Sequence, residues 1–311
     1  MLASAILLGP QRHVPIVRPA VEHLCGPKGG QLALVTAGWE ERETEDAEFR
    51  EHVLWPVINL RLWQRVEQIF ERDPELFAAM RKRHETLRTV QELYRLRLTG
   101  LVEVARTLLR RTGDRALLDP ERVGAVEMLR LLDRFHVERV QQIHEEFDAR
   151  FLPAQRSEVV RHRRELQTIL QDSACLCIAG GHVGLLLHRI SLFDLLRLWG
   201  QRPVVAWSAG AMVLSERIVL FHDDQAQGSA DAEVMEAGFG VLPGIVPLPH
   251  ARQRLRLDDA INVQLFAQRF APALCAVLDV GNRLDWDGKR WSAPAGTRCL
   301  RSTGKLVEVV S

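Results

Sequence analysis

A long stretch with almost no glycine divides this chain, and it limits the possible folds more than any other feature. Residues 40–172 hold only three of the 21 glycines, and they carry 24 basic and 26 acidic residues. Low glycine content, dense charge of both signs and regular apolar spacing indicate long helices with one face in solvent. The flanks are richer in glycine and hold short apolar segments. We therefore expect an α/β domain that a helical segment interrupts.

Apolar spacing predicts about four helices in the glycine-poor stretch. Apolar residues recur three or four positions apart from Leu87 to Leu108, and a second stripe runs from Val140 to Phe151. Pro74, Pro120 and Pro153 fall between the periodic segments, and Asp73 and Asp119 are plausible caps. The helices are expected near 44–72, 74–111, 120–150 and 154–171.

Strands are predicted in both flanks. Short apolar segments bounded by glycine or proline occur at Ala3–Leu8, Gln31–Thr36, Ala174–Ala179 and Pro203–Ala206, with further strand-like segments at 276–279, 290–292 and 305–310. Such strands, alternating with helices, are typical of a mostly parallel sheet with helices on both faces. The expected division is an α/β core at 1–40 and 172–311 with an α-helical insertion at 41–171.

Charge and hydropathy argue against several classes of function. Lys and Arg total 41 and Asp and Glu total 40, so the basic excess of a protein that coats nucleic acid is absent. No apolar run approaches the roughly 18 residues of a membrane span, and the N-terminal segment is typical of a strand rather than of a signal peptide. We expect a cytoplasmic protein that contacts neither nucleic acid nor membrane.

Cysteines and histidines show no metal-binding pattern. The cysteines at 25, 175, 177, 275 and 299 fit no disulfide framework and no zinc spacing, and Cys175 and Cys177 are expected to fill the core as small apolar groups. The insertion has no histidine pair at i,i+4 and no Glu-x-x-His repeat. No metal or organic cofactor is therefore expected. The insertion histidines are predicted to lie at the surface: His84, His136, His144 and His162.

The segment Val204–Leu214 carries the strongest chemical signal. An apolar strand runs into a small-residue turn centred on Ser208 and then into a helix, which is the setting of a nucleophile elbow. The backbone N–H of Ala209, at the start of that helix, is a candidate oxyanion donor. Ala206 stands where the G-x-S-x-G pattern has its first glycine. The alternative interpretation is a close-packed strand–helix turn without a catalytic role.

Other segments supply the groups that a serine nucleophile needs. Gly180–Gly181 end a predicted buried strand, where backbone N–H groups can point into the ligand crevice of an α/β sheet. A nucleophilic serine also needs a base and an acid that orients it. His250 ends an apolar run that prolines interrupt, and Asp223 and Asp224 follow Ser208 by 15 and 16 residues.

These segments together resemble the peptidase E and cyanophycinase family of serine peptidases. The resemblance rests on Trp-Ser-Ala-Gly-Ala after a short strand, the upstream Gly-Gly loop that opens a Leu-rich helix, and the downstream Pro-His. It covers roughly residues 1–40 and 172–295. The family's fold is similar to that of class I glutamine amidotransferases, with serine in place of their cysteine.

The resemblance implies a set of roles. Ser208 would be the nucleophile, His250 the base and Asp223 its acidic partner, while the N–H groups of Gly180 or Gly181, with Ala209, would stabilise the oxyanion. An acidic residue that the family often carries falls on Val280 here, one position after Asp279. Asp279 is therefore an alternative acid, and Asp224, the neighbour of Asp223, is another.

The implied substrate is a short peptide with an aspartyl residue at the scissile bond, including β-linked aspartyl-arginine. Arg252, Arg254 and Arg256 lie just beyond His250 and are candidate contacts for its carboxylate. The insertion is expected to cap the active site, to pair two subunits or to bind a partner.

The sequence leaves two alternatives to the peptidase. One is a non-catalytic binding or assembly protein on the same fold, which works through the helical insertion. The other is a glutaminase-like amide transferase, which needs a thiol where Ser208 stands.

Overall fold

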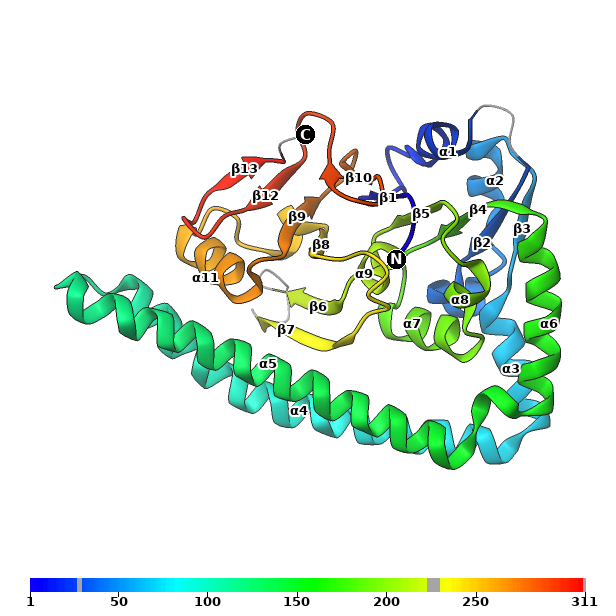
Figure 1. Cartoon of the computed structure of the whole chain (residues 1–311), viewed down its shortest axis with the longest axis horizontal. Helices are drawn as coiled ribbons and strands as arrows, with labels where there is room; N and C mark the ends of the chain where they lie inside the picture. Colours follow the sequence, from blue (N-terminus) through cyan, green and yellow to red (C-terminus); the bar gives the residue numbers. More distant parts are fainter. Residues whose placement is uncertain (27–29, 223–229, 310–311) are drawn as a thin grey trace.

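The structure is a computed structural model that describes residues 1–26, 30–222 and 230–309. A central sheet lies at its core (Figure 1). The strands are, in chain order, β1 (Ala5–Leu8), β2 (Gln31–Val35), β3 (Val57–Asn59), β4 (Ser173–Ile178), β5 (Val204–Trp207), β6 (Arg217–His222), β7 (Ala230–Ala237), β8 (Ile245–Pro249), β9 (Leu274–Leu278), β10 (Arg283–Trp286), β11 (Trp291–Ser292), β12 (Arg298–Leu300) and β13 (Leu306–Glu308). The helices are α1 (Val17–Cys25), α2 (Ala47–Val53), α3 (Leu62–Arg72), α4 (Pro74–Arg110), α5 (Arg115–Phe151), α6 (Ser157–Gln171), α7 (Val183–Leu192), α8 (Leu195–Trp199), α9 (Ala209–Leu214), α10 (Ala251–Arg254) and α11 (Ala260–Phe270), with 3₁₀ turns at Ala37–Arg42 and Pro153–Gln155.

The described strands form three sheets, of seven, four and two strands. The seven-stranded sheet has the order β11-β10-β1-β5-β4-β2-β3, in which the five strands from β1 to β3 are parallel and the two at the β11 edge are antiparallel. A four-stranded sheet has the order β13-β12-β9-β8, and β6 pairs with β7. The predicted mostly parallel sheet is therefore confirmed.

Helices cover both faces of the larger sheet, as expected. Because side chains alternate along a strand, Ile6 and Leu8 of β1 join a cluster under α1 and α2, while Ala5 and Leu7 join the larger cluster under α3, α6, α7 and α9. Cys175 and Cys177 are buried together in the smaller cluster, which confirms them as core residues, and all five cysteines are free. No described helix is both long and apolar enough to cross a membrane.

The predicted helix near 44–72 is wrong. This region holds α2, then β3, then α3, and β3 pairs in parallel with β2 at the sheet edge. Pro56 disfavours helical backbone at Trp55, and Leu54 before it ends α2 in the left-handed conformation at φ 55°. The central sheet therefore extends into the 41–171 segment that the sequence assigned to the insertion.

The other three insertion helices are present, but two of them have shifted starts. Helix α6 begins at Ser157 rather than at residue 154, because the 3₁₀ turn Pro153–Gln155 precedes it. Asp73 caps α4 by accepting a hydrogen bond from the Leu76 N–H at 3.0 Å, as expected. Helix α5 begins at Arg115 rather than at residue 120, because Asp114 caps it instead of Asp119. Pro120 lies in the second turn, where it removes one helical hydrogen bond without ending the helix.

Helices α4 and α5 form a hairpin of two 37-residue arms that runs along the body beneath β7 and α11 (Figure 1). Its turn lies beyond the rest of the molecule in this view. The predicted stripes face inward, since Tyr94 and Leu98 of α4 and Val140 and Phe147 of α5 are buried. The expected long helical insertion is thus confirmed.

A buried polar network fixes this hairpin to the body. Arg269 of α11 donates two hydrogen bonds to Asp133 of α5, at 2.7 and 2.6 Å, and others to the hydroxyl of Tyr94 in α4 and the carbonyl of Ala232 in β7. The Tyr94 hydroxyl also accepts the backbone N–H of Val234 at 3.1 Å. Four elements therefore meet at one guanidinium, whose side chain is 3% exposed.

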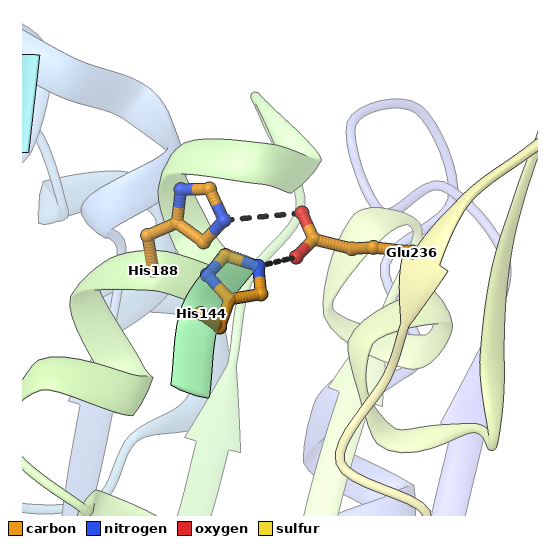
Figure 2. Close-up of side chains that lie close together, drawn as sticks. All are labelled: His144, His188 and Glu236. Atoms are coloured by element: carbon orange, nitrogen blue, oxygen red, sulfur yellow. Dashed lines mark hydrogen bonds and ion pairs between the residues drawn. The ribbon is translucent and has the colours of Figure 1, made fainter. Parts of the chain in front are cut away.

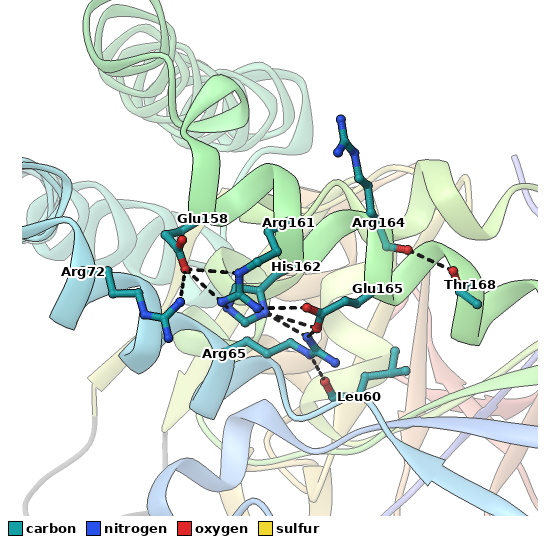
Figure 3. A network of polar contacts seen from close by, with 9 residues as sticks. All are labelled: Leu60, Arg65, Arg72, Glu158, Arg161, His162, Arg164, Glu165 and Thr168. Atoms are coloured by element: carbon teal, nitrogen blue, oxygen red, sulfur yellow. Dashed lines mark hydrogen bonds and ion pairs between the residues drawn. The ribbon is translucent and has the colours of Figure 1, made fainter.

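The insertion histidines are not simply surface residues, so that prediction is wrong for three of the four. His136 is 2% exposed and bonds the Met235 carbonyl at 3.0 Å. His144 bonds Glu236 at 2.8 Å (Figure 2). His162 is 1% exposed within a network of arginines and glutamates that joins α3 to α6 (Figure 3). Partners from distant segments bury these rings, and only His84 is exposed as predicted.

We expect Asp133→Asn to destabilise the fold strongly, because it leaves the buried Arg269 charge without its carboxylate. Breaking a buried ion pair in this way costs about 3–5 kcal/mol of unfolding free energy. Chemical denaturation measures it, with Glu85→Gln at the exposed Arg81–Glu85 pair as the control that leaves the midpoint nearly unchanged. Equal midpoints for the two variants would contradict the role assigned to the network.

Candidate active site

Ser208 occupies a strained turn between β5 and α9. Its backbone has φ 51° and ψ −121°, a region that residues with a side chain rarely adopt, and its N–H donates to the Leu8 carbonyl at 3.2 Å. A Cβ on Gly210 would lie 2.2 Å from the Ile178 carbonyl oxygen, so the turn requires glycine there. Ala206 is fully buried and does not prevent the turn. The backbone thus has the form of a nucleophile elbow.

The Gly180–Gly181 loop lies against this turn. A Cβ on Gly180 would be 2.8 Å from the Ser208 Cβ and 3.5 Å from its Oγ. Gly181 has φ 108° and packs on Gly38, whose carbonyl accepts the His182 N–H at 2.7 Å. These close approaches place the loop at the serine and explain why two glycines stand there.

Backbone donors next to the serine are unused. Within the described parts of the chain, the N–H groups of Gly180, Gly181 and Ala209 donate to no protein acceptor. Such groups beside a half-buried serine are the donors that an oxyanion needs. The structure therefore places Gly180 beside Ser208 and its neighbour Ala209, while Gly181 is the next residue of the same loop and packs on Gly38.

His250 and Asp279 end the neighbouring strands β8 and β9. The His250 N–H donates to the Leu278 carbonyl at 3.3 Å, and a Cβ on Gly9 at the end of β1 would lie 1.9 Å from the Asp279 carbonyl oxygen. The carboxyl ends of β4, β5 and β1 are neighbours in the larger sheet, and those of β9 and β8 are neighbours in the four-stranded sheet. The close approach of Gly9 to Asp279 brings these two sets of strand ends together. Helix α9 packs against both β5 and β8.

The surroundings of His250 favour its neutral form. Burial lowers the pKa of the imidazole, and the positive charge of Arg254 lowers it further, while the Asp279 charge acts in the opposite direction. A neutral imidazole is the form that accepts a proton. Among the described residues, no hydrogen bond joins the His250 ring to Ser208 Oγ, so the structure does not join these two side chains.

Among the described residues, Asp279 is the acid whose charge acts on His250. It is 9% exposed, its Oδ1 accepts the Arg252 N–H at 3.2 Å, and its Oδ2 accepts no hydrogen bond from any described residue. Arg252 Nε lies 3.4 Å from that Oδ2. Asp223 and Asp224 lie outside the described residues. Arg254 is half-buried, whereas Arg252 and Arg256 are exposed.

A second cluster of chemically active side chains was missed by sequence reasoning. His144 of α5, His188 of α7 and Glu236 of β7 meet beside a cavity (Figure 2). No local pattern marks them, because they come from three elements that are far apart in the sequence. Only the folded topology brings them together.

Comparison with known proteins supports the fold alone. No protein-family model matches the chain, and no curated protein sequence matches it. The solved structure of a peptidase from an acI-B1 Actinobacterium is similar, with a TM-score of 0.50 and 11% identity over 99% of this chain and 98% of that one. A "Putative Peptidase E Protein" from Listeria monocytogenes EGD-e has a TM-score of 0.44 and 10% identity, over 94% of this chain and 98% of that one.

The turn at Ser208 should tolerate no side chain at position 210. We expect Gly210→Ala to lower the unfolding free energy by about 1–3 kcal/mol or more, because its methyl group would collide with the Ile178 carbonyl. Gly100→Ala on α4 is the control, since no atom lies within 4 Å of the added Cβ and alanine favours a helix. Denaturation that shows no loss for Gly210→Ala would contradict this packing.

Proposed function

We propose that this protein is a serine hydrolase of the peptidase E type, which cleaves short peptides at an aspartyl residue. The observation that carries the proposal is the strained Ser208 backbone, held beside Gly180 and three unused N–H donors. Backbone strain of this kind is concentrated at sites where a function requires it. The fold shared with a solved structure that is named a peptidase adds support.

In the proposed reaction, Ser208 Oγ attacks the scissile carbonyl carbon while His250 accepts its proton. The N–H of Ala209, with that of Gly180 or Gly181, stabilises the resulting oxyanion. The tetrahedral intermediate then expels the amine, which takes the proton from His250. Water, activated by the same imidazole, hydrolyses the remaining ester and restores Ser208.

The proposal requires His250 to approach Ser208 when substrate binds. Catalytic hydrogen bonds are often long in structures without substrate and shorten in the complex. His250 lies at the start of the short helix α10, with its own backbone at φ 58°. A change in its side-chain rotamer alters its distance to Ser208 without moving β8.

Two residues are candidates for the acid that orients His250, and a different observation supports each of them. The family resemblance favours Asp223, which lies outside the described residues. The structure supports Asp279, because its charge acts on His250 and one of its carboxylate oxygens accepts no hydrogen bond within the described chain. We propose Asp279 as the group that stabilises the imidazolium formed during the reaction.

An acidic substrate fits the charges around His250. Arg254 is half-buried and close enough to lower the pKa of His250, while Arg252 is exposed and pairs with Asp279. A substrate carboxylate would meet these guanidinium groups, which bind carboxylates through paired hydrogen bonds. This supports the aspartyl specificity that the resemblance implies.

Ser208→Ala should abolish hydrolysis while leaving the fold intact, because the alanine methyl group fits where the serine side chain lies. The measurement is cleavage of a mixed α- and β-aspartyl dipeptide library, followed by mass spectrometry. Ser302→Ala, at an exposed turn between β12 and β13, is the matched control and should cleave like the wild type. If the wild type cleaves no dipeptide, the non-catalytic alternative is favoured.

The pH dependence of kcat/KM should report the titration of His250, which sets the acid limb of the profile. Because burial and Arg254 lower its pKa, the neutral base persists below the usual value of about 6.5, and the acid limb should lie below that pH. Arg254→Gln removes a charge that lowers the pKa, so the limb moves to higher pH. Asp279→Asn removes a charge that raises it, so the limb moves to lower pH.

Arg290→Gln, on an exposed turn, is the charge control and should leave the limb in place. If the Arg254 and Asp279 variants move the limb in the same direction, His250 is not the titrating base.

A further inference from the structure

Three potential metal ligands converge at the junction of the hairpin and the sheet domain. His144 Nε2 lies 2.8 Å from one carboxylate oxygen of Glu236, and His188 Nε2 lies 3.0 Å from the other (Figure 2). One ligand atom from each residue lies within 4.8 Å of the other two. The imidazole rings meet edge to face, with centroids 5.6 Å apart. The two rings therefore present nitrogen atoms to a shared carboxylate.

Glu236 is buried between the two histidines, and its side chain is 8% exposed. Each of its carboxylate oxygens has one imidazole nitrogen as a partner. A carboxylate that faces two imidazoles offers the oxygen and nitrogen ligands that divalent first-row metals bind.

The cluster borders a cavity of about 430 Å³. All three ligand residues line it, together with Arg83, Asp148 and Arg163. The two histidines are partly accessible, with side chains 24% and 19% exposed. An ion therefore has a route to the cluster and space for a further ligand.

We propose that His144, His188 and Glu236 bind Zn²⁺. Two imidazoles and one carboxylate form a ligand set that zinc uses in sites with three protein ligands and one open position. Zinc–ligand bonds of about 2.0–2.2 Å in tetrahedral geometry place ligand atoms roughly 3.3–3.6 Å apart. The observed contacts of 2.8 and 3.0 Å and the upper bound of 4.8 Å bracket that spacing.

The fourth coordination position would face the cavity. Arg83 and Arg163 are positively charged groups on the cavity wall, so an anion or a metal-bound water suits that position. Zinc would also join α5 to α7 and β7, which links the hairpin to the helix that follows the Gly180–Gly181 loop. This site uses none of the residues proposed for peptide hydrolysis.

Calorimetric titration of the full chain, freed of metal by a chelator, tests the proposal with Zn²⁺ alone as the ligand. We expect one equivalent to bind and the thermal midpoint to rise in the presence of Zn²⁺. His144→Gln, His188→Gln and Glu236→Gln should each weaken binding by roughly tenfold or more, since each removes one of three ligands. His23→Gln, an exposed histidine on α1, is the matched control. Undiminished binding by the three variants would overturn the proposal.

Two measurements on the wild type keep the test decisive if a variant fails to fold. X-ray absorption at the zinc edge should show only nitrogen and oxygen ligands with two imidazoles. Sulfur ligands would place the ion on the free cysteines and overturn the assignment. Absence of Zn²⁺ binding would also overturn it and would show that the cluster is only a hydrogen-bonded contact. Ser208→Ala should bind Zn²⁺ like the wild type. The zinc titration therefore tests the metal site whether or not the peptidase assay detects cleavage.

Discussion

The buried pair between Arg269 and Asp133 is the contact on which the placement of the helical hairpin depends. Removing both charges from water costs several kcal/mol, which is recovered only when every remaining donor finds an acceptor. Here the guanidinium bonds Asp133, Tyr94 and the Ala232 carbonyl at once. A shift of α5 by one turn would leave the buried Arg269 charge without its carboxylate, and a shift of α4 would remove the Tyr94 hydroxyl that the guanidinium also bonds. The network therefore fixes the register of α4 and α5 against β7 and α11.

That register determines what the hairpin brings to the body. With Asp133 fixed, His144 lies three helical turns further along α5 and reaches Glu236 of β7. The candidate active site depends on a different constraint, namely close backbone contacts at Gly9, Gly180 and Gly210 that any side chain would block. Buried charges thus fix the position of the α4–α5 hairpin, whereas glycines allow the close packing of the turn at Ser208.

Sequence patterns predicted the features that depend on residues close together in the chain. The Asp73 cap, the inward stripes of α4 and α5 and the small-residue turn at Ser208 all depend on neighbours within a few residues. The edge strand β3 was missed because three residues carry little periodicity, and its pairing with β2 is what stabilises it. The burial of His136, like the meeting of His188 with Glu236, is set by tertiary contacts that no local spacing encodes.

Helix α7 connects the two candidate sites through ordinary packing. It starts directly after the loop that presses on Ser208, it carries His188, and it packs against α9, the helix that follows Ser208. A strained residue such as Ser208 keeps its conformation only if its surroundings leave it no alternative. Through its packing on α9 and its place after the glycine loop, α7 is one of the elements that hold Ser208 in its strained conformation.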